Sequence, residues 1–452
     1  MALPGGVVPT DTSISDLGTY TPAPDRPDPV ALLESQSASR LPDLVPLRFG
    51  RMLASPFTFY RGAALLMASD LASGSRSPLQ VHLCGDAHLS NFGAFASPER
   101  RLVFDINDFD ETHPGPFEWD VKRLVTSMEV AGRYRGFTKK ERNQLLRATS
   151  EGYREAMQEL SSQGNLDVWY ASIDIDAVMQ DLRSRMDKAG QKRTGRGLAK
   201  ARTRNSLQAA GKLTTVIDGV RRFIDDPPVI VRAATLIAET NVDVGPAIDA
   251  VPAAWQQYVD SLQPDRRHLL SEYTYVDLAR KVVGVGSVGT RAWVLLMQGR
   301  DASDLLILQL KEAQASVLEG FTAPSAYAQQ GERVVQGQRL LQSASDIFLG
   351  WTRLLNVDYY LRQLRDWKVS VDVDALDLAA LASYGKLCGA TLAKGHARSG
   401  DRMAIASYVG DGTSFDEAMK DFARAYADQN ENDYAALQTA VGEGRVSVLT
   451  DV

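Results

Sequence analysis

The sequence predicts an α+β fold of two lobes, in which a helical lobe carries a polar catalytic segment and a smaller β-rich lobe follows it. Three observations support this prediction. Short apolar strands that end in carboxylates lie within residues 81–120, a glycine loop followed by strands lies within 282–311, and helical periodicity runs through 120–185, 374–397 and 415–440. With 452 residues, the chain is long enough for two or three core-forming units.

The order of these patterns divides the chain into four parts. Residues 1–28 are rich in proline and are expected to form a disordered arm. Residues 29–269, mostly helical from 29 to 75, should form the helical lobe with the catalytic segment, and residues 270–370 the small β-rich lobe. Residues 371–452 should supply C-terminal helices that complete the large lobe.

The catalytic segment reads VHLCGDAHLSNFGAFASPERRLVFDINDFDETHPGPFEWD from position 81 to position 120. Residues 81–83 and 102–106 read as two short strands that would form a hairpin-like site with carboxylates at its ends. Asp86 would orient or deprotonate an attacking hydroxyl, and Asn91 and Asp108 would hold Mg²⁺ or Mn²⁺ against the phosphates of a nucleotide. This set of residue types favours phosphoryl transfer, which needs positioning and charge neutralisation from the protein.

Two alternative interpretations of this segment remain open. The first is that its many acidic residues are solvated turn residues with no catalytic role. The second is a metal-dependent hydrolase, because imidazole, thiolate and carboxylate groups alternate along one extended run and would share one strand face. The residues of this second alternative are His82, Cys84, Asp86 and His88.

A glycine-rich segment, VVGVGSVGTRAWVLLM, occupies residues 282–297. Its glycines, Gly284, Gly286 and Gly289, fit the pattern G-x-G-x-x-G, with Ser287 between the last two. Since a strand, a polar turn and another strand follow, we expect a phosphate-covering hairpin and not the helix that follows a dinucleotide-binding turn. Lys311 would end the last strand and pair with the α- and β-phosphates, unless this is an ordinary hairpin with a solvated lysine.

A helix is expected over about 324–342, and two strands over 345–354 and 359–368. We choose Glu332 as the carboxylate that orients Lys311, with Glu319 as the alternative and an exposed helix charge as the other possible role. The stretch 188–212 has eight Lys or Arg residues and no acidic residue. It reads as a solvated face, with a clamp for an anionic substrate as the alternative.

The composition limits the classes of function. A net charge of −6 argues against binding to nucleic acid, and no apolar run has the length of a membrane span. The two cysteines give no disulfide framework, and the N-terminus lacks the pattern of a signal peptide, so we expect a cytoplasmic protein. No feature predicts the oligomeric state.

The motifs resemble known families. CGDAHLSN resembles the catalytic loop of aminoglycoside and choline phosphotransferases of the protein-kinase-like superfamily, and NDFDE resembles their metal-binding segment. A wider set, SPFTFYRG (55–62), NDFDETHPGPFEWDVKRL and LAKGHARSGD (392–401), resembles the bacterial family called domain of unknown function 2252. The resemblance implies a kinase-like fold with Asp86 as catalytic residue, Asn91 and Asp108 as metal ligands, and Asp120 as support for the catalytic loop. His88 and Asp110 belong to the same motifs as supporting residues, and Cys84 departs from the usual histidine.

The catalytic segment precedes the glycine loop, which is the reverse of the usual kinase order. We therefore expect a circularly permuted, two-lobed protein-kinase-like fold with Lys311 and Asp108 in one cleft. The predicted function is an ATP- and Mg²⁺-dependent phosphotransferase that acts on a hydroxyl of a small molecule. Transfer of a nucleotidyl group and a nucleotide-binding pseudokinase without turnover are the alternatives.

Overall fold

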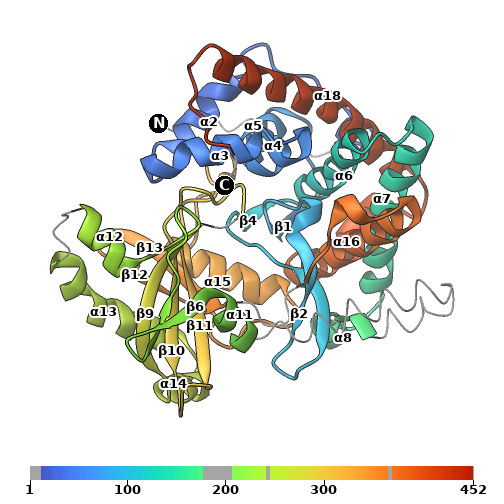
Figure 1. Ribbon diagram of the computed structural model, residues 1–452. Helices are drawn as coiled ribbons and strands as arrows, with labels where there is room; N and C mark the ends of the chain where they lie inside the picture. The colour runs from blue at the N-terminus through green and yellow to red at the C-terminus, as the bar shows by residue number, and fades with distance from the viewer. Residues whose placement is uncertain (1–11, 177–205, 241–244, 283, 365–368, 451–452) are drawn as a thin grey trace.

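The computed structural model describes residues 12–176, 206–240, 245–282, 284–364 and 369–450. Its elements form two groups, a helical lobe and a sheet lobe (Figure 1). In the helical lobe, most helices pack around the core formed by α6, α7, α16 and α18. The helices of this lobe are α1 (Ile14–Leu17), α2 (Pro29–Ser37), α3 (Val45–Met52), α4 (Pro56–Gly62), α5 (Ala64–Ser73), α6 (Phe117–Tyr134), α7 (Lys139–Ser161), α8 (Asn165–Tyr170), α16 (Leu378–Ser399), α17 (Arg402–Val409) and α18 (Ser414–Gly442). Three short 3-10 helices accompany them, η1 (Pro42–Leu44), η2 (Leu89–Asn91) and η3 (Val373–Ala375).

Two small sheets of the helical lobe carry the catalytic segment. Strand β1 (Gln80–Leu83) pairs antiparallel with β4 (His113–Pro116). A separate sheet has the order β14-β2-β3-β5, formed by β14 (Val369–Ser370), β2 (Phe92–Ala96), β3 (Leu102–Ile106) and β5 (Ile173–Asp174). The two predicted strands exist, but the expectation that they form one hairpin is wrong, because each has a different partner strand.

The sheet lobe is built on a six-stranded antiparallel sheet with the order β12-β13-β11-β10-β9-β8. Its strands are β8 (Ile230–Arg232), β9 (Thr274–Lys281), β10 (Ala292–Gln298), β11 (Leu305–Glu312), β12 (Gly350–Leu354) and β13 (Val357–Gln363). The lobe also contains the hairpin of β6 (Thr214–Ile217) and β7 (Val220–Phe223), and the helices α11 (Ser206–Leu213), α12 (Ala233–Thr240), α13 (Gly245–Ser261), α14 (Pro264–Ser271) and α15 (Gln330–Leu341).

Alternating residues on the strands bury both faces of this sheet. Leu296 and Ile307 face a core shared with Phe223 of the β6–β7 hairpin. Their neighbours Met297 and Leu308 face a second core with α13 and α14. This two-sided burial explains why β11 reads as an almost continuous apolar run in the sequence.

The structure corrects two of the predicted boundaries. Elements within 206–271 pack on the six-stranded sheet, so they belong to the sheet lobe and not to the helical lobe predicted over 29–269. Within the predicted disordered arm, residues 12–28 are packed: Leu17 is buried, and Arg26 donates to Asp70 and Asp433. Most of the basic stretch 188–212 lies outside the described residues.

Candidate active site

A cavity of about 160 Å³ lies where the catalytic segment, the glycine loop and the N-terminal helices meet. The catalytic segment contributes Asp86, His88, Asn91, Asp108, Asp110 and Glu111 to its lining, and the glycine loop contributes Gly284, Gly286 and Ser287. The structure therefore brings together two predicted half-sites that are about 200 residues apart in the sequence.

Asp86 lies just after β1, and a buried arginine of α6 fixes its position. Arg123 places Nε 2.8 Å and Nη2 2.7 Å from the Asp86 carboxylate, and its guanidinium lies over the ring of Tyr60. Burial raises the pKa of Asp86, and the charge of Arg123 opposes this shift. The Asp86 side chain is 19 % exposed, and it lines the cavity. It is thus a held but accessible group, as a base or an orienting residue must be.

His88 lies beside Asp86, with Nε2 3.6 Å from the Asp86 carboxylate. Its Nδ1 accepts a hydrogen bond from the Ser90 amide at 3.2 Å, which fixes the ring. Burial, together with the charges of Arg61 and Arg123, holds the pKa of His88 well below its usual range. The imidazole is therefore neutral at physiological pH, and it supports Asp86 by position and not as a second charge.

Asn91 and Asp108 are held next to each other by the β2–β3 pair. The amide of Asn107 donates to the Asn91 carbonyl at 2.8 Å, and Asp108 follows directly. The Asn91 side-chain nitrogen donates to the Asp86 carbonyl at 2.6 Å, so its oxygen is the atom that a cation would meet. Asp108 accepts from the Asp110 amide at 3.2 Å and is 32 % exposed. One amide oxygen and one carboxylate fit Mg²⁺, which takes few protein ligands when phosphates supply the others.

The geometry gives little support to the alternative of a metal-dependent hydrolase. Strand β1 ends at Leu83, so the four residues do not share a strand face. His82 approaches α15 near Gly337, whereas Asp86 and His88 line the cavity. Within the part of the chain that the structure describes, no group of three or more His, Cys, Asp or Glu side chains is arranged to hold a metal ion.

Lys311 is the last residue but one of β11 and is almost fully buried, opposite Ala292 of β10 and Tyr360 of β13. Its Nζ forms an ion pair with Asp110 and lies 3.7 Å from Asp108. Asp110 also accepts from the Tyr360 hydroxyl at 2.8 Å and from Ser287 of the glycine loop at 3.3 Å. Burial lowers the pKa of Lys311, but Asp108 and Asp110 outweigh it, so the net shift is upward and the ammonium stays charged.

The choice of Glu332 as the partner of Lys311 is wrong, because Asp110 and Asp108 take that role. The neighbouring residue of α15, Arg333, is the one that faces the site, and it donates to the carbonyl of Asp110. Residues adjacent on a helix point about 100° apart, so Glu332 and Arg333 cannot face the same partner. The alternative, Glu319, accepts from the Ser325 amide instead.

The glycine loop joins β9 and β10, as predicted, with φ of 68° at Gly284 and 90° at Gly289. Its backbone is fastened to the N-terminal helical region. Arg51 donates to the Gly284 carbonyl at 2.8 Å, Arg40 donates to the Val288 carbonyl, and the Leu41 amide donates to the Gly289 carbonyl at 2.8 Å. Sequence reasoning missed this fastening, and the SPFTFYRG motif near it was the available signal.

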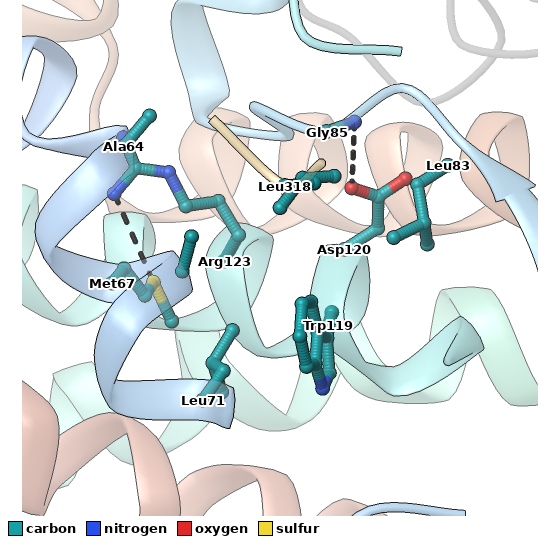
Figure 2. Close-up of a pocket in the computed structure, with 10 residues that line it drawn as sticks. Ala64, Met67, Leu71, Leu83, Gly85, Trp119, Asp120, Arg123 and Leu318 are labelled. Atoms are coloured by element: carbon teal, nitrogen blue, oxygen red, sulfur yellow. Dashed lines mark hydrogen bonds between the residues drawn. The ribbon is translucent and has the colours of Figure 1, made fainter. Parts of the chain in front are cut away.

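Asp120 of α6 supports the catalytic segment from behind. It accepts from the Cys84 amide at 2.8 Å and the Gly85 amide at 3.0 Å, and Figure 2 shows the second contact. Gly85 has φ of 85°, and a Cβ there would collide with the Glu111 carbonyl oxygen. His396, from the LAKGHARSGD motif, lies 3.3 Å from Asp120 and 2.9 Å from the Tyr153 hydroxyl. This buried network is the contact that the resemblance implies for Asp120.

Residues 40–440 match the model of a family described as "Uncharacterized protein conserved in bacteria (DUF2252)". The chain belongs to this family. Gln36 also lines the cavity and lies just before the matched range. The other residues that line the cavity lie within the range that matches DUF2252. No curated protein and no solved structure matches the chain. Among the described helices, none is both long and apolar enough to cross a membrane.

Proposed function

We propose that this DUF2252 protein is an ATP- and Mg²⁺-dependent phosphotransferase with a kinase-like, circularly permuted arrangement, acting on a hydroxyl of a small molecule. One observation carries the proposal. Lys311, near the end of β11 of the sheet lobe, lies 3.7 Å from Asp108 of the catalytic segment, and Ser287 of the glycine loop shares Asp110 with it. A bound triphosphate must touch a cation, a glycine loop and a metal-holding carboxylate at once. Asp108, Asp110 and the glycine loop line one cavity, and Lys311 lies next to the two carboxylates.

Each group has a distinct role in the proposed reaction. Asp86 accepts or orients the hydroxyl proton of the acceptor, and Arg123 keeps the carboxylate in place. Asn91 and Asp108 would hold Mg²⁺, which neutralises phosphate charge when it is bound. Lys311 binds phosphate oxygens, and the backbone of the glycine loop covers them. The catalysis asked of the protein is therefore positioning and charge stabilisation.

A nucleotide-binding module without turnover is the second candidate function. The cavity of about 160 Å³ is smaller than the 300–1,000 Å³ typical of ligand sites, and Lys311 is engaged by Asp110. Such a cleft would have to open before it accepts a nucleotide. The intact set of Asp86, Asn91, Asp108 and Lys311 favours the enzyme.

Isotope transfer tests the proposal. The protein is incubated with Mg²⁺ and either γ-labelled or α-labelled ATP in the presence of a metabolite extract. We expect label from the γ position in an acceptor, whereas α label would show nucleotidyl transfer. A thermal shift with MgATP but no transfer of either label would favour the pseudokinase, and no shift at millimolar MgATP would overturn nucleotide binding.

Asp86→Asn is the decisive variant in this assay. It should lower transfer by about 10²–10⁴-fold, because it removes the group that takes the hydroxyl proton. The thermal shift with MgATP should persist. Asp167→Asn on α8, an exposed residue, makes the same chemical change and should leave both readouts unchanged. Full activity of Asp86→Asn would show that the wrong carboxylate has been chosen.

A further inference from the structure

The cavity is lined by two cations that the proposed chemistry does not use, Arg40 and Arg61. Arg61 lies near the C-terminus of α4, within the motif SPFTFYRG, and lines the cavity together with Asp86 and His88. The helix begins with a capping box formed by Ser55 and Thr58, so its position is well determined. The carbonyl of Arg61 also borders the glycine loop at Gly286.

The Arg61 guanidinium forms no hydrogen bond or ion pair with any residue of the described ranges, and its Nε is buried without a partner. The other arginines near the cavity each donate to a protein group, although the Nε of Arg40 is also buried without a partner. Arg123 pairs with Asp86, Arg51 donates to Gly284, and Arg40 donates to Val288. Burial lowers the pKa of Arg61, and only the more distant charges of Asp86 and Asp374 oppose this. A partly buried guanidinium without an anion is unfavourable unless a ligand completes it.

The acidic residues of the cavity are already engaged. Asp86 has Arg123, Asp108 and Asp110 have Lys311, Glu312 has Arg291, and Glu111 accepts from the Val317 amide. On the side of Asp86, Arg61 is therefore a cation without a counter-ion among the described residues. A planar guanidinium presents two parallel N–H donors, which match the two oxygens of a carboxylate or a phosphate.

We propose that Arg61 binds an anionic group, a carboxylate or a phosphate, on the acceptor whose hydroxyl faces Asp86. This inference rests on the proposed function and narrows its substrate class. It separates this protein from the aminoglycoside and choline phosphotransferases that its catalytic loop resembles, because those acceptors are cations and Arg61 would repel them. Arg40, which lies under the glycine loop, is on the nucleotide side of the cavity and is not part of this site.

Binding of inorganic phosphate to the full chain tests the anion site without any need for catalysis. Titration in the presence of saturating MgADP, followed by thermal shift and calorimetry, should show phosphate binding to the wild type. Arg61→Gln should raise the Kd for phosphate at least tenfold. Arg61→Lys should have a smaller effect, because the positive charge stays but the two parallel N–H donors of the guanidinium are lost. Arg147→Gln on α7, whose side chain is 52 % exposed, makes the same charge change and should have no effect.

The nucleotide is the other source of phosphate that Arg61 could meet. If Arg61 held the terminal phosphate of ATP, Arg61→Gln would weaken MgATP binding but not MgADP binding, and that result would overturn the inference. The expected result is that Arg61→Gln leaves both affinities within twofold. Because Arg61 makes no hydrogen bond within the described structure, the variant should also melt near the wild type.

Matched acceptors complete the test. The transfer assay compares L-serine with ethanolamine, glycerate with glycerol, and glycerol phosphate with glycerol, pairs that differ in one anionic group. We expect transfer only to the members that carry the carboxylate or phosphate group, and Arg61→Gln should raise the KM for them at least tenfold with little change in the KM for ATP. Equal transfer to the members without that group would overturn the inference and leave the proposed function standing. Phosphate binding that depends on Arg61, without any binding of MgATP, would overturn the proposed function and leave the anion site at Arg61 standing.

Discussion

Two buried lysine–aspartate pairs have the same chemistry and different surroundings. Lys394 of α16 pairs with Asp105 of β3, and Lys311 of β11 pairs with Asp110 just beyond β3. Both lysines are nearly inaccessible, at 4 % and 2 % exposure. Their carboxylates differ, because Asp105 is 0 % exposed and Asp110 is 27 % exposed at the cavity wall. The exposure of the anion, and not that of the cation, separates a pair that is buried in the fold from one that faces the cavity.

The pKa shifts of the two lysines follow the same division. Burial lowers the pKa of Lys394, although Asp105 opposes the shift. Lys311 is equally buried, but Asp108 and Asp110 together raise its pKa. A second carboxylate within 3.7 Å is more than a structural pair needs. It holds a charged lysine next to the position where phosphates are proposed to bind.

The largest expected effect comes from removing each lysine in turn. Lys394→Met should lower the free energy of unfolding by about 3–5 kcal/mol, because Asp105 is left buried and unpaired. Lys311→Met should cost less than half of that, since Asp110 keeps the Tyr360 hydroxyl and contact with solvent. Urea titration measures both values. Equal costs would remove the distinction between the two pairs.

Glu111 provides a carboxyl group at the same cavity, and it forms no ion pair within the described part of the chain. Burial raises its pKa from 4.5 to about 7. Above pH 4.5 the unfolded chain loses this proton and the folded chain keeps it, so the stability falls as the pH rises to about 7. The loss is at most about 3 kcal/mol, since one pKa unit corresponds to about 1.4 kcal/mol.

Unfolding midpoints measured between pH 4.5 and 8 test this shift. Glu111→Gln should flatten the profile within that window, and the exposed control Glu99→Gln should not. An unchanged slope in Glu111→Gln would show that Glu111 is ionised throughout and belongs with the paired carboxylates.

The role of Asp108 as a metal ligand should be measurable in the stabilisation of the folded protein by MgATP. At a MgATP concentration of 100 Kd, binding to the folded state adds about 2.7 kcal/mol of stability. Asp108→Ala should abolish the part of the thermal shift that depends on Mg²⁺, measured as the difference between ATP with Mg²⁺ and ATP with EDTA. Asp265→Ala, with a side chain 61 % exposed on α14, is the control. A full Mg²⁺-dependent shift in Asp108→Ala would separate Asp108 from the metal.

The smallest expected effect comes from the two serines that donate to these aspartates. Ser343→Ala removes a hydroxyl 2.8 Å from the buried Asp105 and should cost about 1.5 kcal/mol. Ser287→Ala removes a hydroxyl 3.3 Å from the more exposed Asp110 and should cost under about 0.5 kcal/mol. Thermal unfolding of both variants measures the difference, and a larger cost for Ser287→Ala would contradict the comparison.

Local sequence patterns were a good guide to the separate elements. Val294 and Leu296 lie on a strand, as the apolar run after the glycines predicted, and Lys311 lies one residue before the end of the next strand. The C-terminal helices α16 and α18 also match the predicted periodicity. The sequence predicted the packing partners of these elements less well. The division of the chain at residue 269 was wrong, because the sequence of α13 gives no sign of the sheet on which this helix packs.

By itself, the sequence determined the candidate residues for chemistry. Asp86 and Asp108 follow the short strands β1 and β3, and Asn91 directly precedes β2; a strand that must stop at a glycine or a turn places the next side chains at its end. Only the tertiary structure decided that Asp110 and not Glu332 holds Lys311, that Arg40 and Arg51 fasten the glycine loop, and that Arg61 has no anionic partner among the residues the structure describes. The physical reason is the separation along the chain over which each effect acts. Backbone propensity acts over a few residues, whereas the pairing of buried charges depends on which surfaces meet when segments about 200 residues apart are packed together.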